Sequence, residues 1–139
     1  MLRRMFELIV LPLDASPESE RALQIALDLG RRYQSKLLLL SVLDVEDGDD
    51  RVALIEQKRS VAQNLAEQVG RQVQQAGLAH EVRVEEGRTA FVICDVADEL
   101  GAGLIVMGSR GLGLTEGGLQ QSTSDRVINL SPCPVLVVP

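Results

Sequence analysis

Five short apolar runs alternate with longer stretches that are compatible with helices, and this alternation constrains the fold more than any other feature of the chain. The runs cover residues 7–13, 36–43, 81–86, 104–107 and 135–138. Four of them are nearly continuous in Ile, Val, Leu and Met, which is typical of strands buried on both faces of a parallel sheet. The run at 81–86 alternates instead and is predicted to lie at or near an edge. Strands and helices in strict alternation, joined by right-handed crossovers, predict an α/β three-layer sandwich.

Four helices are predicted between these runs. The first begins at Ser16, which can cap it, and Pro17 suits the first helical position. The others are expected at about residues 51–76, at about 90–100, and from about 122 to a point before Pro132. The second helix is expected to bury one apolar stripe, formed by Leu54, Val61, Leu65, Val69 and Val73.

Composition limits the class of protein. With 139 residues, 45% of them hydrophobic, the chain is predicted to form a single domain over residues 1–139. A net charge of −6 and a shortage of aromatic residues argue against nucleic acid as a partner. No apolar run approaches the roughly 20 residues of a membrane span. Two arginines precede the first run, but Glu7 interrupts it and no small-residue cleavage site follows, so a cytoplasmic location is expected.

A glycine-rich segment, MGSRGLGLTEGGLQQSTSDRV at residues 107–127, follows the fourth run. It is not a Walker A loop, because no GK[ST] follows the glycines. It is not a Rossmann fingerprint either, because Glu116 stands where the third glycine belongs and the segment follows the wrong strand. The GSRG turn and the hydroxyl side chains of QSTS at a helix start are both suited to binding an anion. The glycines could equally serve a loop that binds nothing, and the hydroxyls could be helix caps alone.

Groups for catalysis are scarce. His80, the only histidine, opens the third strand and lies far from the glycine segment in this topology, while Cys94 and Cys133 are interpreted as structural thiols. Asp14 could hold Mg²⁺ or orient water, but it could equally do no more than fix the turn before the first helix. The sequence therefore supports, at most, slow hydrolysis of a nucleotide.

Along its whole length the chain resembles the universal stress protein family. The segments that carry the resemblance are IVLPLDASPESERAL, LLLLSVLD, VICDVADELGAGLIVMGSRG and SDRVINLSPCPVLVVP. The resemblance implies a Rossmann-like fold, similar to adenine-nucleotide hydrolases, with a five-stranded parallel sheet in the order 3-2-1-4-5. Strands one and four would then be neighbours, and the loops that follow them would face one crevice.

The resemblance also implies an adenine-nucleotide site. In nucleotide-binding members the signature is GxxG, nine residues, then G and S or T. Gly108, Gly111 and Ser122 match it, whereas Gln121 stands in place of the last glycine. Asp14 and Val42 would contact the adenine end, and the glycine segment would line the ribose and phosphates. The complete set implied for the site is Pro12, Leu13, Asp14, Val42, Met107, Gly108, Arg110, Gly111, Gln121, Ser122, Thr123 and Ser124.

Gln121 leaves two functions open. Its amide can swing aside and donate to a phosphate oxygen, which predicts a regulatory protein of the stress response that binds ATP, ADP or AMP, with or without Mg²⁺. If the side chain blocks the site, the chain is instead a dimeric interaction protein that has lost nucleotide binding. In both cases a homodimer is expected through the C-terminal strand Val135–Val138, because apolar strand edges tend to be paired or covered.

Overall fold

The fold is an α/β sandwich built on one parallel sheet. The computed structural model describes residues 5–44, 52–109 and 123–139. The elements in these ranges are β1 (Leu8–Pro12), α1 (Pro17–Tyr33), β2 (Lys36–Leu43), α2 (Val52–Gln75), β3 (His80–Glu86), α3 (Thr89–Leu100), β4 (Leu104–Gly108), α4 (Thr123–Leu130) and β5 (Val135–Val138). The strands lie in the order β3-β2-β1-β4-β5, and all neighbours are parallel. The predicted fold class and strand order are confirmed.

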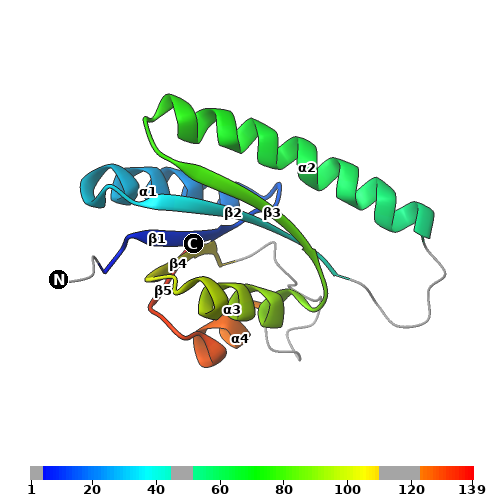
Figure 1. Cartoon of the computed structure of the whole chain (residues 1–139). Helices are drawn as coiled ribbons and strands as arrows, with labels where there is room; N and C mark the ends of the chain where they lie inside the picture. The colour runs from blue at the N-terminus through cyan, green and yellow to red at the C-terminus, as the bar shows by residue number, and fades with distance from the viewer. Residues whose placement is uncertain (1–4, 45–51, 110–122) are drawn as a thin grey trace.

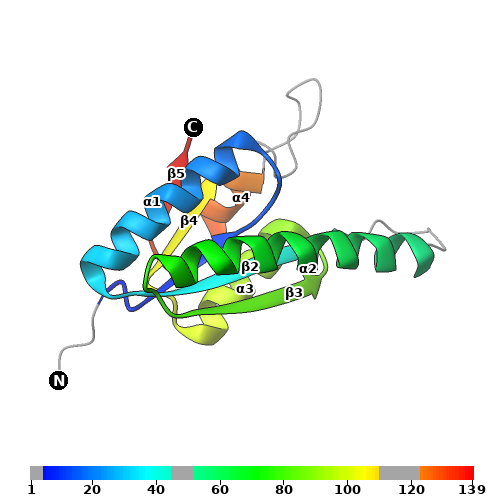
Figure 2. The same cartoon turned by 90° about the horizontal axis from the view of Figure 1, so that it is seen from above.

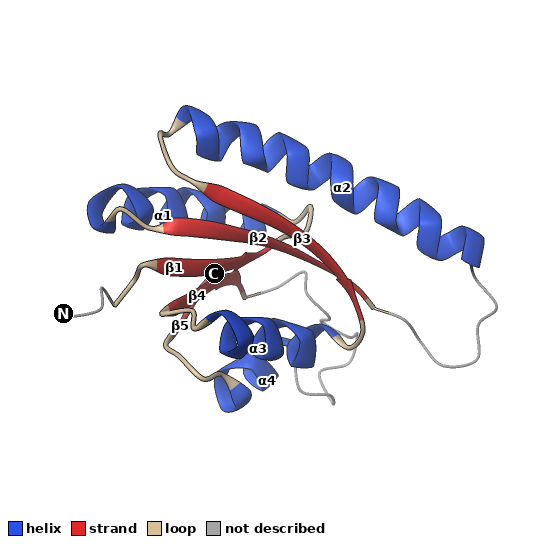
Figure 3. Ribbon diagram, in the orientation of Figure 1, coloured by secondary structure: helices blue, strands red, loops and turns tan. Residues whose placement is uncertain are grey.

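The sheet is the middle of three layers (Figure 1, Figure 3). Helices α1 and α2 cover one face, and α3 and α4 cover the other (Figure 1). Each face has its own hydrophobic core, and β2 contributes to both: Leu37 and Leu39 pack on one side, Leu38 and Leu40 on the other. Side chains of a strand alternate between the two faces, so a strand covered on both faces must be apolar throughout.

The helix starts and ends follow the expected chemistry. Ser16 caps α1, its hydroxyl accepting a hydrogen bond from the Ser19 amide at 3.1 Å, and Pro17 takes the first helical position as predicted. The third helix ends at Gly101, which adopts a left-handed conformation with φ of 65°. At the sheet edge, β3 is largely exposed or half-buried, which confirms the edge predicted from its alternating sequence.

Helix α2 differs from its prediction. Val69 and Val73 are buried as expected, but Val61 is 63% exposed and Leu54 and Leu65 are only half-buried. The helix has 24 residues whereas β3 has 7, and its amino half runs past the end of that strand (Figure 2). The prediction for Val61 is wrong because helical periodicity identifies the apolar side of a helix but does not say how far the sheet beneath that helix extends. Neither α2 nor any other helix in the described ranges has the length and hydropathy of a membrane span.

Candidate functional site

The loop between β1 and α1 holds Asp14 in a network of short hydrogen bonds. One carboxylate oxygen, Oδ1, accepts from the Ser16 amide at 2.8 Å and from the Ser16 hydroxyl at 2.5 Å. The Asp14 amide donates to the Ser19 hydroxyl at 3.2 Å. This is the turn-fixing role that the sequence left open, and it fixes where the carboxylate points.

The second carboxylate oxygen of Asp14 is not used by the turn. Oδ2 is buried and has no hydrogen-bond partner among the residues that the structure describes. A buried carboxylate oxygen without a donor is costly, and native structures seldom leave one so unless something else binds there. Fixing the turn therefore explains the role of only one of the two carboxylate oxygens of Asp14.

A pocket of about 520 Å³ lies beside this carboxylate, at the carboxyl ends of β1 and β2 and beneath the amino half of α2. It brings together three residues that the sequence assigned to the site: Leu13, Asp14 and Val42. The exposed stripe of α2 forms the opposite wall. The described residues of its lining are Leu13, Asp14, Ala15, Ser41, Val42, Leu43, Asp44, Leu54, Gln57, Lys58, Val61, Ala62 and Leu65. Its size is within the range of small-molecule sites, and its place at the strand ends is where open α/β sheets bind ligands.

Sequence reasoning missed Ser41. This residue interrupts the leucine run of β2 and is only 4% exposed, and within the described part of the chain its hydroxyl has no hydrogen-bond partner. The signal that could have found it is a single polar residue in an otherwise apolar strand that is buried on both faces. Ser41 and Asp14 thus place two buried, unpartnered polar groups in the lining of one pocket.

The charges of the pocket do not suit a polyanion. Among the described residues of its lining are two carboxylates, Asp14 and Asp44, and a single positively charged residue, Lys58. Asp44 is already engaged, because its Oδ2 accepts a hydrogen bond from the Thr89 hydroxyl at 3.1 Å. The described part of the pocket therefore favours a neutral, largely apolar group with a hydrogen-bond donor for Asp14.

Gly108, the first glycine of the GxxG motif, has a structural reason to be glycine. It ends β4, and a Cβ built on it would lie 2.8 Å from the Glu18 Cβ and 3.1 Å from the Ser19 amide nitrogen, in the first turn of α1. This close approach brings the end of β4 against the start of α1. Strands β1 and β4 are paired in parallel, with Ile9 opposite Leu104, so the carboxyl ends of these two strands are neighbours, as the family resemblance implied.

The other described residues of the implied site lie outside the lining of this pocket. Pro12 and Met107 are buried in the sheet, and Met107 belongs to the core between the sheet and α3. Thr123 and Ser124 open α4 and are buried there. Arg110, Gly111, Gln121 and Ser122 lie outside the described residues, so the predicted phosphate contacts and the role of Gln121 stay predictions.

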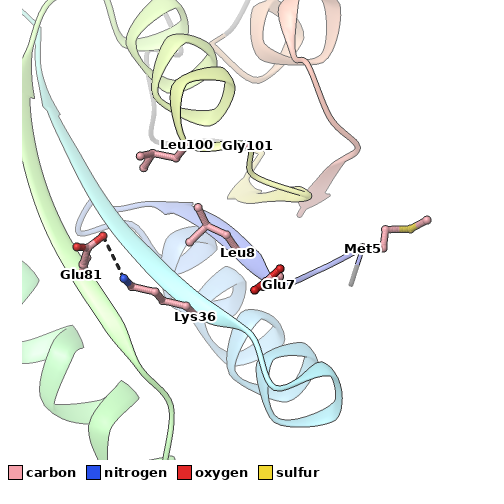
Figure 4. A pocket seen from close by; sticks show the side chains of 7 residues that line it. All are labelled: Met5, Glu7, Leu8, Lys36, Glu81, Leu100 and Gly101. Carbon is pink, nitrogen blue, oxygen red and sulfur yellow. Dashed lines mark ion pairs between the residues drawn. The ribbon is translucent and has the colours of Figure 1, made fainter. Parts of the chain in front are cut away.

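A second pocket of similar size, about 540 Å³, lies at the opposite, amino-terminal ends of β1 and β2 (Figure 4). Lys36 of β2 and Glu81 of β3 point toward each other there, with 3.4 Å between Nζ and Oε2 (Figure 4). Nearby, the Ser35 hydroxyl donates to the Phe6 carbonyl at 2.5 Å. Because these polar groups already have partners, this pocket presents no comparable demand for a ligand.

The cysteines do not supply a reactive thiol. Cys94 is buried in the core beneath α3, and burial raises the pKa of its thiol above the usual value. Burial also raises the pKa of Cys133, although a hydrogen bond from Ser131 opposes this effect. A raised pKa lowers the thiolate fraction and with it the nucleophilicity. In the described ranges, no group of three or more His, Cys, Asp or Glu side chains is placed to hold a metal ion.

Comparison with known proteins agrees with this architecture. Residues 5–139 match the sequence model described as the universal stress protein family. The universal stress protein Sll1654 of Synechocystis sp. is 48% identical over 136 residues, which cover 97% of this chain and 87% of that protein. A solved structure from the same family in Burkholderia pseudomallei has a TM-score of 0.80 at 26% identity, covering 99% of both chains. A family protein from Arabidopsis thaliana, solved with AMP bound, has a TM-score of 0.69 at 22% identity, covering 94% of this chain and 90% of that one.

Proposed function

The chain belongs to the universal stress protein family, and from this premise we propose that it is a regulatory protein that binds an adenine nucleotide. The observation that carries the proposal is the pocket at the ends of β1 and β2, whose lining includes Asp14, a residue with one buried carboxylate oxygen that has no hydrogen-bond partner in the described ranges. ATP, ADP and AMP share the adenosine that this pocket would hold, so the proposal covers all three.

The chemistry of the pocket supports a purine base. Its apolar lining, including Leu13, Leu54 and Leu65, suits a flat aromatic ring, which loses little on leaving water. A carboxylate only accepts hydrogen bonds, and the exocyclic amino group of adenine only donates them. The AMP bound to the Arabidopsis protein is a ligand of this class, although the likeness at 22% identity establishes the fold alone.

A magnesium ion would enter with the nucleotide. Asp14 is a single carboxylate with one oxygen already occupied, whereas Mg²⁺ prefers six oxygen ligands and commonly takes several from phosphates and water. We therefore expect Mg²⁺ to contribute to the binding of ATP and little to that of AMP.

Calorimetric titration of AMP, ADP and ATP, with and without Mg²⁺, tests the proposal. The informative variant is Asp14→Asn, because the amide oxygen of Asn can still accept from Ser16 while its NH₂ group replaces the unpartnered acceptor with a donor. Asp28→Asn is the matched control, since Asp28 is an exposed carboxylate on α1 that pairs with Arg32. Binding by the wild type and by the control, with marked loss in Asp14→Asn, supports the site.

Gln121→Gly separates the two functions that the sequence left open. If the wild type does not bind and this variant does, the side chain of Gln121 closes the site and the proposal for the natural protein is wrong. If both bind, Gln121 is tolerated. If neither binds, nucleotide binding is overturned for this chain altogether.

A second proposal concerns assembly: the chain forms a homodimer through β5. This strand is an edge of the sheet, and Leu136 on it is 38% exposed. An apolar strand edge that is exposed is commonly covered by a partner. Light scattering at micromolar concentration should give the dimer mass, and Leu136→Lys should shift it to the monomer. Val82→Lys, on the opposite edge strand β3, is the matched control and should leave the dimer intact.

A further inference from the structure

We infer that Ser41 is a ligand-contacting residue of the same pocket and that, together with Asp14, it selects a 6-aminopurine over a 6-oxopurine. The inference rests on the proposed function and goes beyond it, because it names a specificity residue and the chemical group that this residue reads. Its basis is a pair of buried polar atoms, Ser41 Oγ and Asp14 Oδ2, which have no hydrogen-bond partner among the described residues and belong to two residues that line one pocket.

The position of Ser41 in β2 explains why its hydroxyl is unusual. Alternation along the strand puts Ser41 on the same face as Leu37 and Leu39, which pack under α1 and α2. In the parallel register Ser41 lies opposite Val84 of β3, so its strand neighbour offers no polar side chain. The same-face residues of β2 and the residue opposite in β3 are apolar, so a hydroxyl without a partner at this position is a cost to the unliganded protein.

Ser35 provides an internal reference at the other end of the same strand. It precedes β2, is 3% exposed, and its hydroxyl donates to the Phe6 carbonyl at 2.5 Å. Ser35 and Ser41 are therefore equally buried and differ in whether the protein itself satisfies the hydroxyl. From this difference we conclude that the Ser35 hydroxyl stabilises the fold, whereas the Ser41 hydroxyl is available to a ligand in the pocket.

The two groups in the pocket have complementary requirements. Asp14 Oδ2 can only accept, whereas a serine hydroxyl can donate and accept. A 6-aminopurine offers both an amino donor and ring nitrogen acceptors on one flat edge. A 6-oxopurine would turn an acceptor oxygen toward the carboxylate, and two acceptors facing each other in a buried site repel. An ordered water that bridges the two groups would satisfy them too, but it would give no preference between the purines.

Titration of AMP and of IMP, whose base carries a 6-oxo group, into three proteins tests the inference. The proteins are the wild type, Ser41→Ala, and Ser35→Ala as the matched control, and each is also melted without ligand. We expect the wild type to prefer AMP and Ser41→Ala to bind AMP about 5-fold to 10-fold more weakly, with a smaller AMP preference. The melting temperature of unliganded Ser41→Ala should be unchanged or higher, because the variant removes an unpartnered hydroxyl. Ser35→Ala should melt earlier and keep wild-type affinity for both nucleotides.

Three results would overturn the inference. Equal AMP affinity in the wild type and Ser41→Ala rejects it and leaves the proposed function standing. If Ser41→Ala weakens the affinities for AMP and IMP equally and also melts at a lower temperature, Ser41 only stabilises the strand. No binding of either nucleotide to the wild type rejects both the inference and the proposed function, so the two failures are distinguishable.

Discussion

The two ends of β2 have opposite polar arrangements. At the amino end the Ser35 hydroxyl and the Lys36–Glu81 ion pair are satisfied by the protein itself. At the carboxyl end the Ser41 hydroxyl and one oxygen of Asp14 are buried and have no partner in the part of the chain that the structure describes. Both ends carry a pocket of similar volume, about 540 Å³ and about 520 Å³, so size does not separate them. Unmet hydrogen-bonding capacity, rather than volume, distinguishes the candidate site from a surface hollow.

The largest expected effect comes from crowding the carboxyl end. Gly108→Val would drive its side chain into the backbone of the first turn of α1, since even a Cβ lies 3.0 Å from the Glu18 carbonyl carbon. We expect a loss of about 3 kcal/mol in the free energy of unfolding, measured by urea denaturation.

Gly103→Ala is the counterpart at the other end of β4. Its Cβ would meet the Met5 carbonyl oxygen at 1.7 Å, but Met5 precedes the first strand and can shift. The loss should be smaller than that of Gly108→Val. A larger loss at Gly103 would contradict the view that the carboxyl end is the more tightly constrained one.

The next effect is on binding rather than folding. Asp14→Asn should weaken the affinity for AMP by about 30-fold, or about 2 kcal/mol, because it replaces a charged acceptor with a donor in a buried site. The free energy of unfolding should change little, since Asn supports the same turn. Calorimetry and urea denaturation of the same preparation measure the two quantities. A large loss of stability would mean that Oδ2 serves the fold after all.

Ser16→Ala should cost about 1 kcal/mol of stability, because it removes the cap of α1. The same change releases Asp14 Oδ1 from the hydroxyl donor that holds it at 2.5 Å. Its effect on AMP binding should therefore be intermediate between those of Asp14→Asn and the wild type. Stability that is unchanged in thermal melting would show that the network around Asp14 contributes nothing to α1.

The smallest expected effect is at the amino end. Lys36→Met breaks an ion pair whose side chains are both well exposed, and such pairs contribute less than about 0.5 kcal/mol. Thermal melting should show a shift near the error of the measurement, and AMP affinity should not change. A clear loss of affinity would mean that the two pockets are coupled.

The sequence predicted the sheet well because its strands are buried on both faces. Such strands must be apolar throughout, as in residues 37–40. This pattern can be recognised in the sequence without knowing which strands lie beside it. The helix starts were predictable for a similar reason, since the cap at Ser16 is local chemistry. Strand order was different: it came from the family resemblance, because alternation alone does not say which strands are neighbours.

The candidate site was only partly predictable. Asp14 and Val42 followed from the resemblance, but Ser41 did not, because whether a hydroxyl is satisfied depends on atoms distant in sequence. Val61 was assigned to the core for the complementary reason: its spacing on α2 is helical, while the sheet that would bury it ends too early. In both cases the sequence does not say which atoms from distant parts of the chain lie beside the residue.

The central place of β1 has a consequence for how a nascent chain acquires this fold. Ile9 pairs with Leu37 on one side and with Leu104 on the other, so the neighbouring strands on the two sides of β1 are synthesised at very different times. Until β4 leaves the ribosome, β1 has a bare edge whose amides and carbonyls can pair with any extended segment nearby. Pairings over long sequence separation also form slowly, because loop closure opposes them. The strand at the centre of the finished sheet is therefore exposed longest while the protein is being made.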